Sequence, residues 1–266
     1  MSAEDPLARY VREHAQRALS GLESIARDAD VESVHHTRTS LRRLRATVRT
    51  FARSFPEPGA LDEDLRFVAL ALGRIRDADV LAGSLLPELD ALPEDLVLGP
   101  ARRDLAEALS ARRREGLDAL SAASEDPRWG RATEQLTAWC SDPPALTGQD
   151  VTKTLKKSRR RVRRRIRSSE GHPVALHSAR KAAKRWRYAA ELLADAEPAA
   201  ATHLEQATTA QQVLGDLQDA VVACEFLREH AAQGARSGHN AFTTGLLYAS
   251  ARGRVEDATA RALDLV

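Results

Sequence analysis

Histidine and arginine residues form a row within residues 34–55. This stretch holds six arginines and no acidic residue. On a helix, which turns by about 100° per residue, the polar members of the row fall within an arc of about 80°. These members are His35, Arg38, Arg42, Arg45, Arg49 and Arg53. The part from His35 to Arg49 is about 21 Å long, and guanidinium groups can donate two hydrogen bonds to one phosphate. The row therefore fits a linear ligand that carries repeated phosphates.

A second run repeats this pattern 142 residues further along the chain. The segments LGRIRDADV (72–80) and LGDLQDAVV (214–222) align at the same offset, so Asp77 corresponds to Asp219. We expect each aspartate to orient an arginine or histidine of the basic helix in its own half. Two motifs in one register indicate an internal duplication. The residues that repeat the first row are His177, Arg180, Lys184 and Arg187, and the repeat then ends, because Glu191 stands where Arg49 stands in the first row.

The segment 151–169, VTKTLKKSRRRVRRRIRSS, is the most basic part of the chain. It keeps one apolar seam, and nearly every other helical position is Lys or Arg. Most charge runs are simply solvated faces. Here, however, acidic partners are missing, and like charges four residues apart destabilise a helix, which favours an anionic ligand. We predict that the polyanion-binding residues in this segment are Lys153, Lys156, Lys157, Arg160, Arg163 and Arg164.

The elements that position these cations are predicted to be helices. Apolar residues make up 43% of the chain and aromatic residues only 4%, a composition that favours an all-α fold. Turn signals divide the chain into about eight helices, with a short extra helix near 129–140 as an option. We expect two four-helix halves, residues 1–140 and 150–266, joined by a linker at 141–149. The predicted helices span residues 6–29, 31–55, 60–90, 101–124, 149–169, 173–195, 198–232 and 239–264.

The duplicated motif H-x-x-R-x-x-x-[RK]-R-x-R, each copy followed by L-G-x-[IL]-x-D-A-x-V, resembles the CHAD family (conserved histidine α-helical domain). The resemblance covers essentially the whole chain as one domain, 1–266. It implies two four-helix bundles related by a pseudo-two-fold axis, which bind inorganic polyphosphate in a central basic groove or pore. It also implies a stand-alone binder associated with polyphosphate granules, because 266 residues leave no room for a fused catalytic domain. The matching residues are His35, Arg38, Arg42, Arg43 and Arg45 in the first motif and His177, Arg180, Lys184, Arg185 and Arg187 in the second.

Three other classes of function remain as alternatives, one of which is a structural helical adaptor whose basic faces are simply solvated. A metal-dependent phosphohydrolase could draw its ligands from His35, His36, Asp77, Asp79, His177 and Asp219, although no H-E-x-x-H or phosphate-binding glycine loop accompanies them. A nucleic-acid-binding protein would share the phosphate contacts, but base stacking requires aromatic side chains among the cations. We therefore expect a binder that has no enzymatic activity and needs no metal or cofactor.

The sequence also predicts where the protein works. No run of about 18 apolar residues occurs that would cross a membrane, and the first residues lack a signal-peptide pattern. Cys140 and Cys224 are isolated from each other in apolar helical segments, which is typical of reduced thiols. These features favour a cytoplasmic protein.

Overall fold

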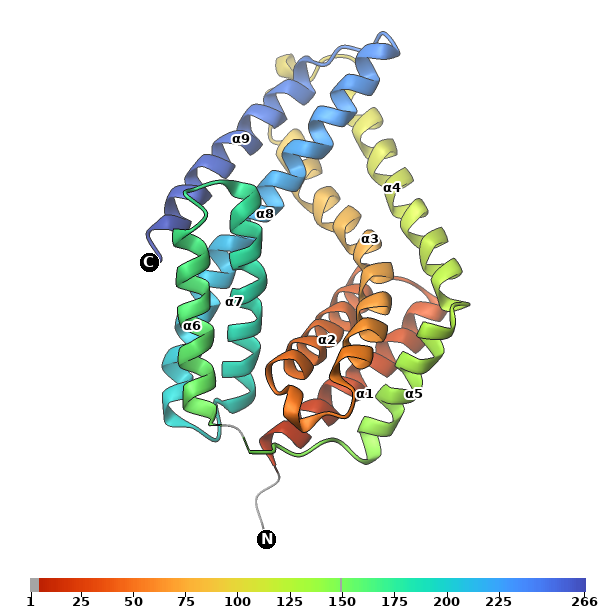
Figure 1. Ribbon diagram of the computed structural model, residues 1–266. Coiled ribbons are helices and arrows are strands. Elements are labelled where there is room, and N and C mark those ends of the chain that lie inside the picture. Colours follow the sequence, from red (N-terminus) through yellow and green to blue (C-terminus); the bar gives the residue numbers. More distant parts are fainter. Residues whose placement is uncertain (1–4, 149) are drawn as a thin grey trace.

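The computed structural model describes residues 5–148 and 150–266 (Figure 1). Over these residues the chain forms nine α-helices and two short 3₁₀ turns, and no strand. The all-α class is therefore confirmed. The elements are α1 (Pro6–Arg27), α2 (Val31–Thr50), η1 (Ala52–Ser54), α3 (Pro58–Asp90), η2 (Glu94–Leu96), α4 (Ala101–Ser124), α5 (Pro127–Ser141), α6 (Val151–Arg167), α7 (Pro173–Leu193), α8 (Pro198–Arg236) and α9 (Phe242–Leu263).

Aspartate and proline residues fix where several helices begin. The side chains of Asp5 and Asp30 each accept two backbone N–H hydrogen bonds in the first turns of α1 and α2. Asp150 accepts one from the backbone N–H of Lys153 at the start of α6. Such caps satisfy donors that have no partner within the helix. Proline occupies the first position of α1, α3, α5, α7 and α8, where its fixed φ suits a helix start.

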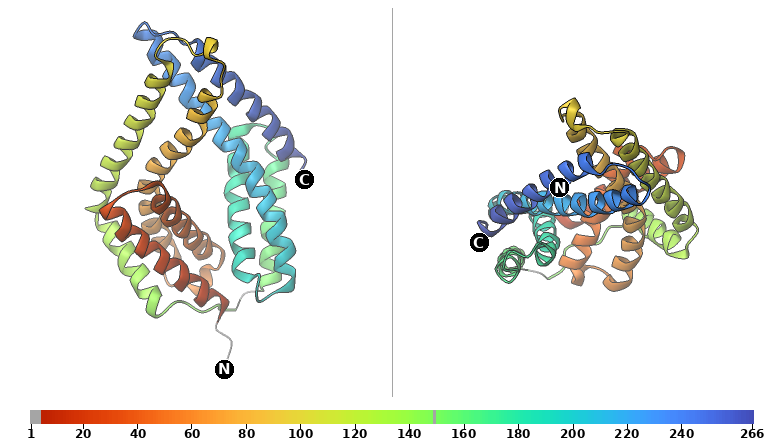
Figure 2. Two further views of the ribbon diagram at one scale, coloured as in Figure 1. Left: turned by 180° about the vertical axis from the view of Figure 1, so that it is seen from behind. Right: turned by 90° about the horizontal axis from the view of Figure 1, so that it is seen from above.

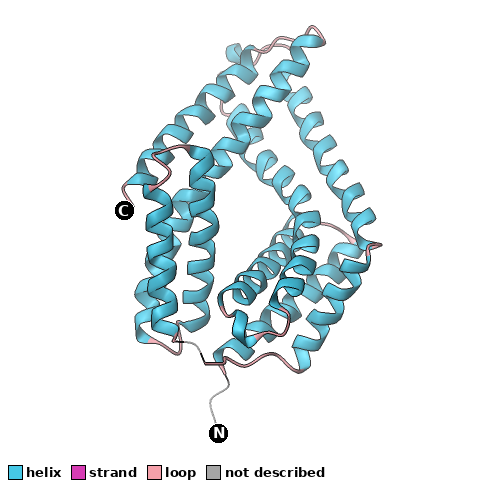
Figure 3. Ribbon diagram, in the orientation of Figure 1, coloured by secondary structure: helices cyan, strands magenta, loops and turns pink. Residues whose placement is uncertain are grey.

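Most helix ends lie within three residues of the predicted ones, and three larger differences occur. Figure 3 colours the observed helices and loops. The optional helix near 129–140 is present as α5, so five helices lie in the first half. Helix α2 ends at Thr50 and η1 follows it, whereas one helix was expected to reach residue 55. Helix α8 continues to Arg236, four residues past its predicted end. Residues 1–4 and 149, which belong to the predicted first half and linker, lie outside the described part of the chain.

The helices follow the same order in the two halves (Figure 2). Helices α1 to α4 correspond to α6 to α9, and in each set the third helix is the longest and forms a hairpin with the fourth. Helix α5 has no counterpart in the second half and packs against α1 and α3. This order agrees with the predicted duplication, and α2 and α7, the two helices that carry the duplicated motif, pack against each other across the halves.

Two apolar clusters hold these helices together. The larger cluster includes the apolar sides of the basic helices, with Leu41 and Leu44 on α2 and Ala183 and Trp186 on α7. The smaller cluster joins the far ends of the two long hairpins, α3–α4 and α8–α9, through side chains such as Leu85, Leu105, Leu227 and Leu247. Because the apolar side of each basic helix is fixed in the core, its cationic side must face away from the core.

Candidate functional site

A cleft of about 490 Å³ lies between the two halves, lined by α2, α3, α7 and α8. We call it the central cleft. It brings together eight of the residues that the sequence singled out, four from each half. Helices α2 and α7 supply the cations and histidines, and α3 and α8 supply the aspartates. These residues are His35, Arg38, Arg42, Asp77, His177, Arg180, Lys184 and Asp219.

The two aspartates each lie near an arginine of their own half. The Arg38 guanidinium is 3.5 Å from Asp77, and the Arg180 guanidinium is 3.9 Å from Asp219. These corresponding pairs are long, and the aspartate side chains are 56% and 57% exposed. Arg38 also crosses close to Gly73, where an added Cβ would lie 3.4 Å from the guanidinium. The aspartates therefore hold the arginines loosely and leave most of their hydrogen-bonding capacity for a ligand.

Several donors in the central cleft are buried without a protein partner. The Nε atoms of Arg38, Arg42 and Arg180 are not exposed to solvent and make no hydrogen bond within the described residues. Burial lowers the pKa of Arg38 and of Arg180, yet guanidinium groups remain protonated in proteins. A buried donor without an acceptor is costly, so this cleft is suited to a ligand rich in anionic oxygens.

Lys184 is the most strongly perturbed cation of the cleft. Its side chain makes no ion pair within the part of the chain that is described, and its pKa is lowered from 10.5 to about 6. Burial is the largest cause of this shift, the positive charges of Arg42, Arg180 and Arg38 act in the same direction, and Asp219 opposes them only weakly. The negative charge near this lysine is therefore too small to offset burial and the neighbouring cations. A bound anion would restore its proton.

The two histidines that head the rows also lie at this cleft. Burial, followed by the charge of Arg76, lowers the pKa of His35. A hydrogen bond joins Nδ1 of His177 to Oε1 of Gln218. Arg76 and Gln218 both line the cleft, and they occupy corresponding positions in the two Leu-Gly segments. Sequence reasoning missed this pair, although the position before each aspartate is a signal that could have found it.

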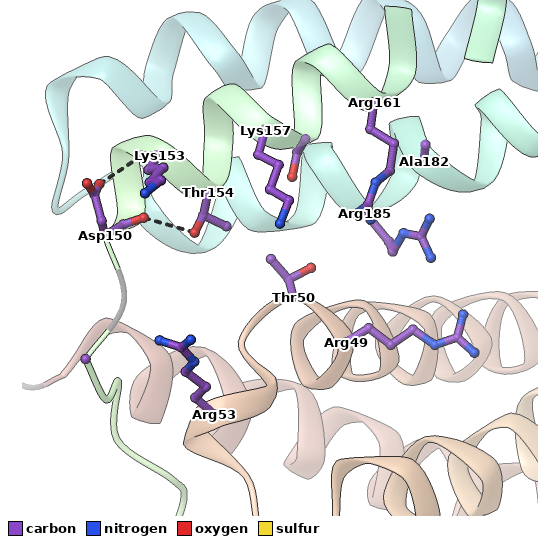
Figure 4. A pocket seen from close by; sticks show the side chains of 12 residues that line it. Arg49, Thr50, Arg53, Asp150, Lys153, Thr154, Lys157, Arg161, Ala182 and Arg185 are labelled. Atoms are coloured by element: carbon purple, nitrogen blue, oxygen red, sulfur yellow. Dashed lines mark hydrogen bonds between the residues drawn. The ribbon is translucent and has the colours of Figure 1, made fainter. Parts of the chain in front are cut away.

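A second cleft, of about 520 Å³, lies where the end of α2 faces α6 and α7. We call it the end cleft. In Figure 4, Lys157 and Arg185 point from α6 and α7 toward Arg49 and Thr50 of α2. Four of its cations, Arg49, Lys153, Lys157 and Arg185, were predicted as binding residues. Arg53 was seen as part of the row but not assigned, and Arg161 was missed, although it continues the four-residue spacing of Lys153 and Lys157.

Almost all cations of the end cleft lack an acidic partner. Arg49 pairs with Asp62. The side chains of Arg53, Lys153, Lys157, Arg161 and Arg185 make no ion pair or hydrogen bond within the described residues. Burial, followed by the charges of Arg165, Arg161 and Arg49, lowers the pKa of Arg185. The end cleft is therefore a second concentration of positive charge, in which Asp150 is the one carboxylate among the described lining residues.

Three arginines of the matched motifs lie outside both clefts and bind acidic side chains. Arg43 donates to Glu191 at 2.7 Å, and Arg187 lies 3.8 Å from the same carboxylate. Arg45 donates to Asp62 at 3.1 Å. Burial lowers the pKa of Arg43, but its hydrogen bond and charge interaction with Glu191 outweigh burial and raise it. These arginines fasten helices together in the unliganded protein, and their role in ligand binding stays a prediction.

The remaining predicted cations of α6 are dispersed. Lys156, Arg160 and Arg164 are exposed and line neither the central nor the end cleft. Arg163 faces a smaller apolar cleft beside Trp186. Trp186 is buried and donates its Nε1–H to His203, so it belongs to the core, as its position in the sequence indicated. The structure thus divides the basic face of α6 into a part that enters the end cleft and a part that does not.

Four of the residues considered as metal ligands line the central cleft, but they are not arranged as a metal-binding cluster. Within residues 5–148 and 150–266, no group of three or more His, Cys, Asp or Glu side chains is arranged to hold a metal ion. Asp79, one of the candidates, accepts a hydrogen bond from Arg113 at 2.9 Å. Within the same residues, no helix is both long and apolar enough to pass through a membrane.

Comparisons with known proteins identify relatives of this chain. The CHAD domain family model matches residues 9–228. Two Mycobacterium tuberculosis proteins, "Uncharacterized protein MT2285" and "Uncharacterized protein Rv2226", are each 32% identical to the chain over 257 residues, covering 92% of this chain. The alignment covers 49% of those proteins, so the chain spans about half the length of these relatives.

Two solved structures have a similar fold. The crystal structure of the CHAD domain from the plant Ricinus communis matches with a TM-score of 0.69 and 25% identity, covering all of this chain and 93% of that one. PptA from Streptomyces chartreusis matches with a TM-score of 0.74 and 21% identity, covering 98% and 97% of the two chains. The likeness to PptA concerns the fold alone.

Proposed function

The chain belongs to the CHAD domain family, and from that premise we propose that it binds inorganic polyphosphate in the central cleft, between its two halves. Family membership supports a function related to polyphosphate, and the contents of the cleft support the specific binding mode. The observation that carries the proposal is the environment of Lys184. This lysine lies among three arginines, has no acidic partner in the described structure, and has a pKa of about 6 in the absence of a ligand.

The proposed mode of binding follows from the arrangement of donors. Arg38 and Arg42 approach the ligand from one half, and Arg180 and Lys184 approach it from the other. Consecutive phosphates of the polymer would accept hydrogen bonds alternately from the two halves. Because each neutralised phosphate releases counterions, the affinity should fall steeply with salt concentration.

We also propose that the protein does not hydrolyse the polymer. Hydrolysis of a phosphoanhydride needs a positioned water and groups that activate it. Arginines supply charge but no general base. Among the aspartates of the cleft, Asp77 and Asp219 each lie beside an arginine of their own half, and Asp216 pairs with Arg261. Polyphosphate incubated for hours with the protein and Mg²⁺ or Mn²⁺ should keep its length distribution on a gel. Release of orthophosphate that disappears in Asp77→Asn would contradict this proposal.

Nucleic-acid binding is less well supported by the clefts. No Phe, Tyr or Trp side chain lines either cleft among the described residues, so bases would find cations but no stacking surface. The test is a titration with long-chain polyphosphate and with single-stranded DNA at matched phosphate concentration. We expect clearly tighter binding of polyphosphate at every salt concentration. Equal or tighter binding of DNA would overturn the assignment.

A further inference from the structure

The end cleft should affect how polyphosphates of different length bind. This inference rests on the proposed function. The central and end clefts share no lining residue. Both nevertheless draw cations from the same row on α2. Arg38 and Arg42 belong to the central cleft. Arg49, in the last turn of α2, and Arg53, just past the end of α2, belong to the end cleft. The row that looked continuous in the sequence is therefore divided into two sites.

The carboxylate of Asp62 separates the central cleft from the end cleft. Arg45 lies between Arg42 and Arg49 on α2, and it donates to Asp62 at 3.1 Å. Asp62 is buried and also accepts from Arg49. From Arg42 to Arg49 the helix rises by about 10 Å. A short oligophosphate in one cleft would meet this neutralised segment before it reached the other cleft.

The second observation concerns the cations on the opposite side of the end cleft. Helix α6 presents Lys153, Lys157 and Arg161 at four-residue spacing, and α7 adds Arg185. None of these side chains has an acidic partner in the described part of the chain. The end cleft is therefore a complete anion site by itself and not merely an extension of the central one.

We propose that the protein holds polyphosphate at two stations, the central cleft and the end cleft, and selects long chains by bridging them. Short oligophosphates occupy the two stations independently, so two oligophosphates bind to each protein molecule. A long polymer occupies both stations at once, so one polymer binds to each protein molecule. Linking two binding events raises the apparent affinity by a factor of about 10² to 10⁴ when the linker spans the sites.

Two double variants of α6 test this proposal with equal changes in charge. Lys153→Glu/Lys157→Glu reverses two cations of the end cleft. Arg159→Glu/Arg167→Glu reverses two exposed cations on the same helix that line neither the central nor the end cleft and are not among the predicted binding residues. Calorimetric titrations with triphosphate and with long-chain polyphosphate give the stoichiometry and the affinity. Circular dichroism checks that both variants keep the helical content of the parent protein.

In the parent protein we expect two triphosphates per chain and about one binding event per chain for the long polymer. In the end-cleft variant, triphosphate stoichiometry should fall to one, and affinity for the long polymer should fall by about tenfold or more. The control variant should keep two triphosphates and lose about threefold or less, because its charges lie in solvent and are screened.

The possible failures are distinguishable. If the long polymer binds with high affinity but both double variants weaken it equally, or the parent binds a single triphosphate, the two-station inference is wrong and the central-cleft function stands. If neither ligand binds the parent protein, the proposed function itself fails and the inference falls with it.

Discussion

The two halves of the molecule share a centre and differ at its edges. In the centre, Arg38–Asp77 and Arg180–Asp219 are the same arrangement repeated 142 residues apart. At the edge, α2 carries Arg49, which reaches the end cleft, whereas α7 carries Glu191 at the corresponding position. Glu191 binds Arg43 and Arg187 and accepts a hydrogen bond from the Tyr10 hydroxyl at 3.2 Å. The first half thus extends its row of cations to Arg49. In the second half the row ends at Glu191, which binds Arg43 of the first half and so holds the two halves together.

This difference shows that two halves with the same helix order can differ where their neighbours differ. The central pairs set up a surface that both halves share. The flanks meet different neighbours. In the first half the flank faces α6, and in the second half it faces α1 and α2. The following predictions are ordered from the largest expected effect to the smallest.

Reversing charge in either half of the central cleft should have the largest effect. Arg38→Glu/Arg42→Glu and Arg180→Glu/Lys184→Glu should each weaken binding of long-chain polyphosphate by well over tenfold, because each removes two phosphate contacts and adds repulsion. Fluorescence anisotropy with labelled polymer measures the loss. The halves are equivalent at the centre only if the two losses are similar. Loss in one variant and none in the other would show that a single half binds the ligand.

The lowered pKa of Lys184 predicts that polyphosphate binding depends on pH. In the free protein its pKa of about 6 leaves the amine neutral at pH 7 to 8, and a bound polyanion raises that pKa again. Binding therefore takes up a proton, and affinity should fall as the pH rises above about 6, by up to about tenfold per pH unit for one proton. Below pH 6 the lysine is already protonated and the dependence should level off.

The variant Lys184→Arg separates this effect from the titration of the ligand. Arginine keeps its charge at all these pH values, so the variant should bind with a flatter pH profile while retaining high affinity. His35, whose pKa burial also lowers, should account for what slope remains. Identical slopes in the parent protein and in Lys184→Arg would contradict the role given to Lys184.

Removing the charge of Glu191 should destabilise the contact between the halves. The Glu191 side chain is 24% exposed and neutralises two largely buried arginines. Glu191→Gln should lower the free energy of unfolding by about 1–3 kcal/mol, because it leaves two cations without a counterion. Urea unfolding measures the change. The matched control is Glu256→Gln, which breaks an exposed pair with Arg252 and should cost about 0.5 kcal/mol or less. Equal losses in both variants would mean that Glu191 does not fasten the halves.

The aspartates of the central cleft should have the smallest effect on stability. Because both carboxylates are more than half exposed and their pairs are long, Asp77→Asn and Asp219→Asn should change the free energy of unfolding by about 0.5 kcal/mol or less. Each should tighten polyphosphate binding slightly, since a negative charge leaves the cleft. Differential scanning calorimetry and the same binding titration check both effects. A large stability loss would show that these carboxylates are structural partners of the arginines.

The sequence predicted the centre of the site better than its edges, for a physical reason. Helical spacing and the 142-residue offset place Arg38, Arg180 and Lys184 on corresponding faces, and the structure brings those faces together. The offset also aligned Glu191 with Arg49. By contrast, no spacing relates Asp62 to Arg45, because that contact depends on how α3 packs across α2. Local periodicity fixes which side of a helix a residue occupies, whereas the identity of its neighbour depends on tertiary packing.

The same limit applies to the basic helix α6. Its sequence shows cations on nearly all sides, so Lys153 and Lys156 looked equivalent. Only the packing of α6 against α7, and the position of the end of α2, separates Lys153, which lines the end cleft, from Lys156, which does not. The segment DPRWG (126–130) is typical of a turn, which makes a helix there only an option from the sequence. In the structure, Asp126 and Pro127 of this segment provide the cap and first residue of α5.

A crystal structure of the protein with bound polyphosphate would test the central claim most directly. The account predicts phosphate groups in the central cleft between Arg42 and Lys184, contacting residues of both α2 and α7. Phosphates found only on the exposed face of α6, around Lys156 and Arg160, with the central cleft unchanged, would contradict it.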